Sequence, residues 1–99
     1  MSKADRIAPA LPTEHTKYRL TGHADRRLRE IDRMMNAALV KQVLENGDRL
    51  PGKESGTTEL VLTVAATEFV VIVDNEINPE WERHDIITMF PRERKEITE

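Results

Sequence analysis

The chain has 99 residues, of which 38% are hydrophobic and 33% are charged. This length allows one domain with a modest core. The absence of cysteine excludes disulfide scaffolds, cysteine-based zinc fingers and thiol catalysis. The net charge is −3, but residues 1–33 carry +3 and residues 34–99 carry −6. A strongly basic domain would indicate nucleic-acid binding. The negative net charge of this chain argues against non-specific binding of nucleic acid.

The two ends of the chain are expected to lie outside the folded domain. Residues 1–16 contain Pro9 and Pro12 and lack periodic apolar residues, so they predict a flexible arm. Residues 93–99 are expected to form a solvated tail, which leaves residues 17–92 for a single domain. The chain has no apolar run long enough for a membrane span and no apolar core of a signal peptide. We therefore expect a cytoplasmic protein that does not associate with membranes.

Residues 23–46 show the pattern of an amphipathic helix. Apolar side chains recur every three or four positions, for example at Leu28, Ile31, Met35 and Leu39. No proline or glycine interrupts the run, and an Asn-Gly pair at its end is a typical stop signal. The period does not decide between one long helix and two shorter ones.

The second half of the chain has the composition of a sheet. Residues 59–74 are rich in Val, Leu, Ile, Phe and Thr, and a break at residues 65–67 divides them into two strands. Three strands are expected in all, at residues 60–64, 69–73 and 85–90. Residues 48–57 and 75–83 are predicted to be loops, and Pro91 is predicted to end the last strand. The resulting prediction is an α+β fold in which the N-terminal helical element packs on a three-stranded antiparallel sheet.

His23 and Arg27 are the most suggestive pair of polar residues. They stand four positions apart at the predicted start of the helix, so an imidazole and a guanidinium would share one helix face. Phosphodiester cleavage needs such groups, one to transfer a proton and one to stabilise phosphate charge. A His at a helix start with Arg nearby is more often an ordinary solvated helix surface. No glycine-rich phosphate loop or metal-ligand spacing is present, so neither a metal site nor a cofactor is predicted.

These residues belong to a longer pattern. Residues 21–28 (TGHADRRL), 40–47 (VKQVLENG) and 86–90 (IITMF) resemble the small single-domain family known as domain of unknown function 4258. That family is similar to the barnase–EndoU–colicin–RelE group of metal-independent ribonucleases and toxins, in which helices pack on an antiparallel sheet. The resemblance extends over about residues 18–92.

The resemblance implies a small ribonuclease-like or toxin-like protein that acts on RNA without a metal. By this likeness His23 would be the acid or base, Arg27 a cation that binds phosphate, and Thr88 a hydroxyl that orients the substrate. Arg26 and Arg33, on the same helical element, would contribute to substrate binding.

A second hypothesis rests on the acidic part of the chain. The residues that it assigns to a binding surface are Glu80, Trp81, Glu82 and Asp85. Tryptophan is common at the centre of protein interfaces, and clustered carboxylates suit a basic partner. This hypothesis predicts a non-catalytic interaction protein, such as a phage- or plasmid-encoded inhibitor or an antitoxin-like module. Trp81 could instead cover a sheet edge, and the sequence also allows a homodimer.

Overall fold

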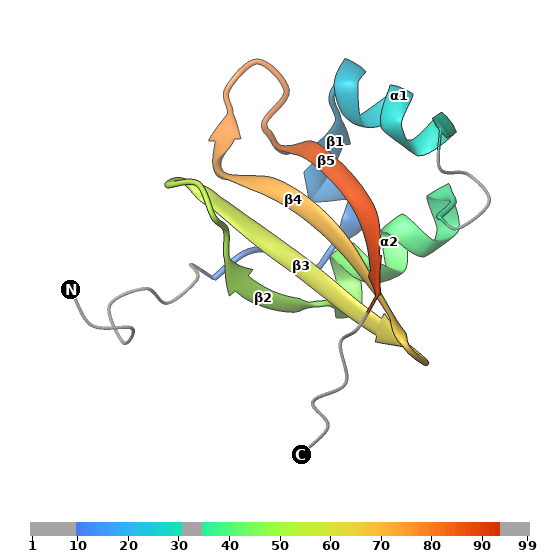
Figure 1. The fold of residues 1–99 in the computed structure, drawn as a ribbon. Coiled ribbons are helices and arrows are strands. Elements are labelled where there is room, and N and C mark those ends of the chain that lie inside the picture. The colour runs from blue at the N-terminus through green and yellow to red at the C-terminus, as the bar shows by residue number, and fades with distance from the viewer. Residues whose placement is uncertain (1–9, 31–34, 94–99) are drawn as a thin grey trace.

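The computed structural model describes residues 10–30 and 35–93 of the chain. A short 3₁₀ turn, η2, at His15–Lys17 precedes the first strand. The strands and helices that follow, in chain order, are β1 (Tyr18–Leu20), α1 (Gly22–Glu30), α2 (Ala37–Asn46), β2 (Asp48–Pro51), β3 (Thr57–Val64), β4 (Thr67–Asn78) and β5 (Arg83–Glu93) (Figure 1).

In the described part of the chain, the sheet has five strands in the order β1-β5-β4-β3-β2. Strand β1 runs parallel to β5, whereas the other neighbours are antiparallel, so the sheet is mixed. The predicted three-stranded antiparallel sheet is therefore wrong. The additional edge strand β2 lies in the segment predicted to be a loop, where Pro51 pairs with Thr58 at the end of the strand. Proline is tolerated at such an edge because few ladder hydrogen bonds are lost there.

Strands β4 and β5 are longer than the sequence predicts. Together they form a hairpin through most of the segment predicted to be a polar connection, and Ile77 pairs with His84 near its tip. Strand β5 also continues through Pro91, which pairs with Phe69. Within the described ranges, β5 has a partner only on its β4 side after Ile86, and an edge strand accommodates a residue without an amide hydrogen.

Of the two possibilities that the period leaves open, the described residues show two short helices. Asn36 has an extended backbone, with φ of −133°, and its side-chain oxygen accepts a hydrogen bond from the Leu39 amide at 2.9 Å. Asn36 therefore caps the start of α2 and breaks the run without a proline or glycine. Residues 31–34, between the two helices, lie outside the described ranges.

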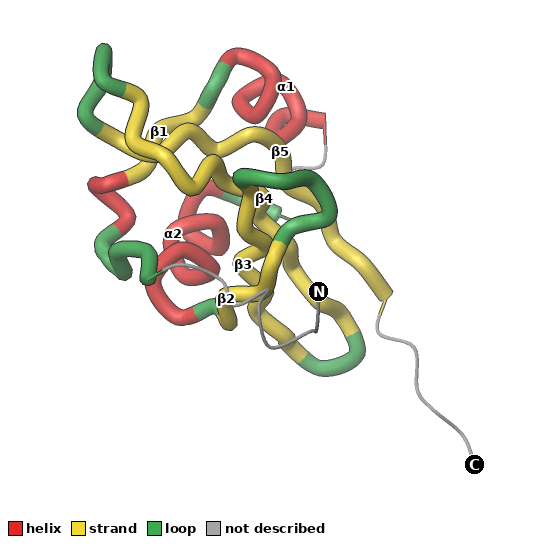
Figure 2. The backbone as a smooth tube through the Cα atoms, turned by 90° about the vertical axis from the view of Figure 1, so that its left-hand side faces the viewer, coloured by secondary structure: helices red, strands yellow, loops and turns green. Residues whose placement is uncertain are grey.

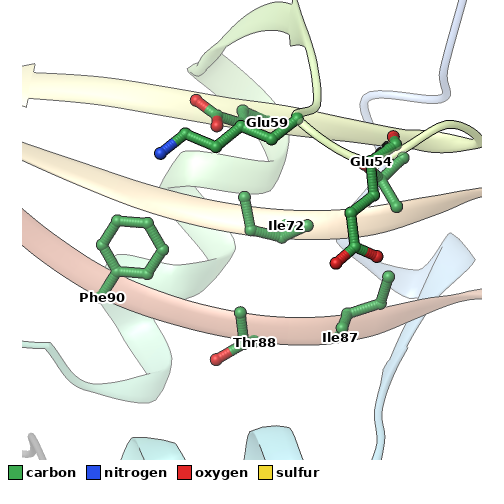
Figure 3. A pocket seen from close by; sticks show the side chains of 8 residues that line it. Glu54, Glu59, Ile72, Ile87, Thr88 and Phe90 are labelled. Carbon is green, nitrogen blue, oxygen red and sulfur yellow. Dashed lines mark hydrogen bonds between the residues drawn. The ribbon is translucent and has the colours of Figure 1, made fainter.

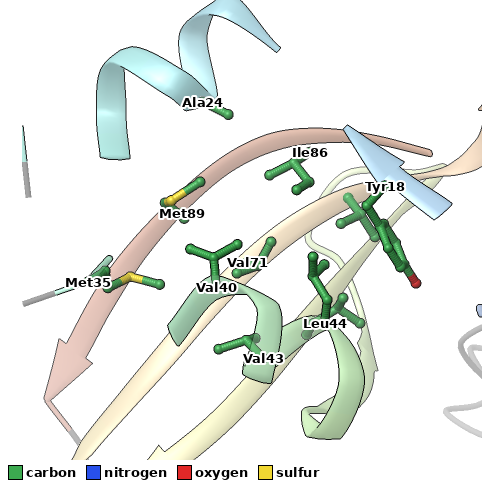
Figure 4. Close-up of a cluster of buried hydrophobic side chains, with 11 residues drawn as sticks. Tyr18, Ala24, Met35, Val40, Val43, Leu44, Val71, Ile86 and Met89 are labelled. Atoms are coloured by element: carbon green, nitrogen blue, oxygen red, sulfur yellow. The ribbon is translucent and has the colours of Figure 1, made fainter. Parts of the chain in front are cut away.

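The helices pack against the same side of the sheet but at different strands. Helix α1 contacts β1 and β5, whereas α2 contacts β3 and β4 (Figure 2). The buried side chains between the two layers form one core, shown in Figure 4, that includes Ala24, Met35, Val40, Val43, Leu44, Leu60, Val71, Val73, Ile86 and Met89. Neither of these helices is long and apolar enough to cross a membrane.

Residues 10–16, which form part of the predicted arm, contact the body of the protein. Leu11 is partly buried against the core. The carbonyl oxygen of Pro12 accepts hydrogen bonds from Tyr18 Oη at 2.6 Å and from Arg49 Nη2 at 3.0 Å. Residues 1–9 of the arm and 94–99 of the tail lie outside the described ranges.

Gly47 joins α2 to β2 at a point of close backbone contact. A Cβ atom at this position would lie 2.6 Å from the Val43 carbonyl oxygen and 3.2 Å from the Val61 amide nitrogen. Gly47→Ala is therefore expected to lower the free energy of unfolding by roughly 1–3 kcal/mol, because backbone atoms must move to relieve the overlap. Urea denaturation measures the change.

Gly22→Ala is the matched control, since a Cβ at Gly22 would meet no atom within 4 Å. This variant should be as stable as the wild type or slightly more so, because alanine favours helices over glycine. Equal stability of the Gly47→Ala variant and the wild type would contradict the close contact at the α2–β2 junction.

Tyr18 is the single tyrosine of the chain, and its burial raises the pKa of the phenol, an effect that the Arg49 charge partly offsets. We expect its ionisation, followed by ultraviolet absorbance, to have a midpoint above the usual value of about 10. Since the folded protein holds the proton more tightly, the free energy of unfolding should fall as the pH rises through this range. In the Tyr18→Phe variant, the free energy of unfolding should lack the part of this decrease that comes from the phenol. An ionisation midpoint of Tyr18 at or below the usual value would contradict the burial of the phenol.

Candidate functional site

The start of α1 is attached to β5 by Thr21. The Thr21 hydroxyl accepts a hydrogen bond from the Ala24 amide at 3.1 Å and donates one to the Ile86 carbonyl oxygen at 2.9 Å. The first contact is an N-cap, which satisfies an amide that the helix leaves unpaired. The second contact joins that cap to the last strand. Ala24 is fully buried beneath the turn, so α1 lies directly against β5.

His23 and Arg27 lie on this docked helix. His23 is exposed in the first turn. Arg27 reaches β5, where its Nε donates a hydrogen bond to the Met89 carbonyl oxygen at 3.3 Å, while its Nη1 lies 3.8 Å from Glu30. The Arg27 side chain is 40% exposed beside the strand.

Thr88 immediately precedes Met89, the residue that Arg27 contacts. A β-bulge in β5 changes the direction in which the Thr88 side chain points. Ile72 pairs with Thr88 and Val73 pairs with Ile86, so Ile87 is an extra residue in β5. Ile86 and Met89 consequently both face the core, whereas Ile87 and Thr88 face the opposite side of the sheet. In Figure 3 the Thr88 hydroxyl points away from Ile72, towards the edge of β5.

The structure thus brings Arg27 to the strand that carries Thr88 and leaves His23 exposed on the same helix. Within the described ranges, His23 and Arg27 line neither the cavity between α2, β1 and β5 nor the one on the opposite face of the sheet. Of the two predicted substrate-binding arginines, Arg26 is exposed on α1. Arg33 lies outside the described ranges. Arg29, a further arginine of α1, forms an ion pair with Asp25 at 3.2 Å.

The face of the sheet opposite the helices contains a cavity of about 260 Å³ that the sequence did not reveal. Its floor includes Ile72, Thr88 and Phe90, and Glu59 lies on its wall (Figure 3). Glu59 is 8% exposed, and Arg92 Nη1 lies 3.7 Å from its carboxylate. Glu59 was the signal available in the sequence, because it is the single charged residue of β3. It could not show which other strands would lie beside it.

The acidic surface of the second hypothesis lies at the β4–β5 hairpin. Glu80 and Glu82 are exposed in its turn, and Trp81 between them is 50% exposed. Asp85 differs from them because it accepts hydrogen bonds from Arg19 Nε at 2.7 Å and Asn78 Nδ2 at 3.0 Å. Asp85 therefore stabilises the hairpin, and the two glutamates are the carboxylates that face solvent.

Trp81 contacts the neighbouring strand instead of standing alone. The guanidinium carbon of Arg19 lies 4.9 Å from the centre of the indole ring, the geometry of a cation–π interaction. Arg19 thereby contacts both Asp85 and Trp81, and it holds the hairpin against β1. Half of the indole remains available to a partner.

The histidines do not form a metal site in the described part of the chain, which contains no group of three or more side chains suited to bind a metal. His84 is buried, and its Nδ1 hydrogen-bonds to the Asp74 carbonyl oxygen at 2.9 Å. His15 Nδ1 contacts Glu45 at 2.7 Å, and this hydrogen bond lowers the pKa of the Glu45 carboxyl.

Comparisons of the chain with protein-family models, curated proteins and solved structures found no match. The resemblance to domain of unknown function 4258 therefore stays a prediction.

Proposed function

We propose that the protein is a small metal-independent ribonuclease-like or toxin-like protein that acts on RNA where α1 meets β5. The hydrogen bond from Arg27 Nε to the Met89 carbonyl oxygen supports this proposal, because it holds a guanidinium next to the strand position of Thr88. His23 precedes Arg27 by about one turn, so both side chains share one face of α1. The exposed Arg26 adds a cation for the RNA backbone.

Metal-free cleavage of RNA needs few groups. The 2′-hydroxyl attacks the adjacent phosphorus, the bond to the 5′-oxygen of the next nucleotide breaks, and a cyclic phosphate forms. An imidazole transfers a proton near neutral pH in such reactions, and a fixed guanidinium stabilises the added charge on the phosphate. In the proposal His23 has the first role and Arg27 the second, while the Thr88 hydroxyl orients the substrate from the edge of β5.

His23→Ala and Arg27→Ala are each expected to lower the rate of RNA cleavage by about 10²-fold or more, since proton transfer and charge stabilisation are lost. The assay uses single-stranded and structured RNA with EDTA present, because the resemblance implies chemistry without a metal. Arg26→Ala should instead weaken RNA binding and reduce the salt dependence of the affinity by one phosphate contact.

Arg29→Ala is the control on the same helix, because Arg29 is 79% exposed and is paired with Asp25. It should retain wild-type cleavage. Thermal melts of all variants exclude unfolding as the cause of a loss, which matters for Arg27 because it also contacts β5. Wild-type protein that leaves both RNA substrates intact at micromolar concentration would disprove the proposed activity.

The half-exposed Trp81 between two exposed glutamates favours a second candidate function, an interaction module for a basic partner. A lysine-rich peptide serves as the probe. Glu80→Lys combined with Glu82→Lys should weaken its binding about tenfold or more, because attraction becomes repulsion. Asp48→Lys with Glu54→Lys makes the same charge change at exposed positions of other elements and serves as control. Equal binding by the two double variants would exclude the hairpin as the acidic surface.

A further inference from the structure

A cavity of about 300 Å³ lies between α2, β1 and β5, and Arg19 is shared between its lining and the contacts that hold the acidic hairpin. Its walls are mainly aliphatic and include Leu20, Val40, Leu44 and Ile86. Pockets for small molecules typically start at about this volume and combine apolar walls with a few polar groups. The cavity is therefore large enough for a small organic body.

The polar side chains of this cavity are nearly all basic. Four basic residues line it, each from a different element: His15 from η2, Arg19 from β1, Lys41 from α2 and Arg83 from β5. No aspartate or glutamate of residues 10–30 or 35–93 is among its lining residues. This is a marked local excess of positive charge in a chain that has 18 acidic and 15 basic residues.

Two of these basic side chains already have carboxylate partners at the rim. Arg19 binds Asp85 at 2.7 Å, and His15 binds Glu45 at 2.7 Å. Lys41 and Arg83 are exposed, and neither lies within ion-pair distance of a carboxylate of the described residues. The rim therefore offers two cations to a ligand, from the two sides of an apolar cavity.

We propose that this cavity binds a small aliphatic carboxylate, with its hydrocarbon chain between α2 and β5 and its carboxylate between Lys41 and Arg83. Removal of the ligand's hydrocarbon chain from water favours binding, and the two cations select for its carboxylate. This site is independent of the proposed action on RNA, because none of the groups assigned to that reaction lines the cavity.

The walls favour a hydrocarbon over a nucleobase. Burial of a base requires hydrogen-bond partners for its edge atoms, and an unpaired polar group is costly away from water. The aliphatic walls offer no such partners. Tyr18 also lines the cavity, but its hydroxyl already donates a hydrogen bond to the Pro12 carbonyl oxygen. A nucleotide could thus place its phosphate at the rim but would leave its base unsatisfied.

The test uses octanoate as the probe and Trp81 as the reporter. Trp81 is the single tryptophan and stacks on Arg19, which lines the cavity, so its emission should change as octanoate binds. Calorimetry gives a second readout that does not depend on fluorescence. Octanoate should bind with one site per chain and at least tenfold more tightly than octanol, which lacks the charge, or acetate, which lacks the chain.

Variants locate the site. Lys41→Glu and Arg83→Glu should each weaken octanoate binding about tenfold without changing the melting temperature, because both residues are exposed. Ala37→Phe, at an exposed lining position, should block the cavity. Lys53→Glu makes the same charge change at an exposed lysine that lines the other cavity, and should bind octanoate as the wild type does.

Three results would each overturn the proposal. Octanol could bind as tightly as octanoate, which would show that the rim charges select nothing. Octanoate binding could survive both charge reversals and Ala37→Phe, which would place it elsewhere. A nucleoside monophosphate could bind more tightly than octanoate and be blocked by Ala37→Phe, which would assign the cavity to nucleotides.

Discussion

The parallel pairing of β1 with β5 determines where the candidate sites of this protein lie. Tyr18, Arg19 and Leu20 stand opposite His84, Asp85 and Ile86, so the first strand lies beside the last. Parallel strands require a long crossover, and here two helices and three strands separate the partners. Helix α1 begins at Gly22, directly after β1, and must therefore lie against β5.

Arg19 couples this pairing to the surface chemistry. Its guanidinium binds Asp85 on β5 and contacts the ring of Trp81 in the hairpin turn. One side chain of a three-residue strand thus holds the acidic hairpin in place and also lines the cavity between the layers. The side chains of Arg19 and Asp85 are only 26% and 21% exposed, so solvent screens this pair less than a typical surface ion pair.

The bulge in β5 gives the last strand two roles. Ile86 and Met89 complete the core beneath α1, while Ile87 and Thr88 line the cavity on the other face of the sheet. In a regular strand Thr88 would share the face of Ile86, because side chains alternate with a period of two. The extra residue moves the Thr88 hydroxyl to the other face, and Arg27 contacts the backbone of the next residue. Bulges often redirect side chains near functional sites. In the proposed reaction, this bulge sets the direction from which Thr88 would reach the substrate.

Local patterns in the sequence determined a helix start near His23, the end of α2 before Gly47, and the strand pair around the turn at Ala65 and Ala66. They also placed His23 and Arg27 on one helix face. These features depend on residues a few positions apart, so periodicity and capping chemistry are enough to predict them.

The tertiary structure alone decided the rest. Strands β1 and β2 have three and four residues, too few to show a period, and each exists through its hydrogen bonds to a longer neighbour. The bulge at Ile87 and the four basic residues around the inner cavity depend on the register between segments far apart in the chain. Such registers are set by which apolar faces are buried together, and no single segment of the sequence contains that information.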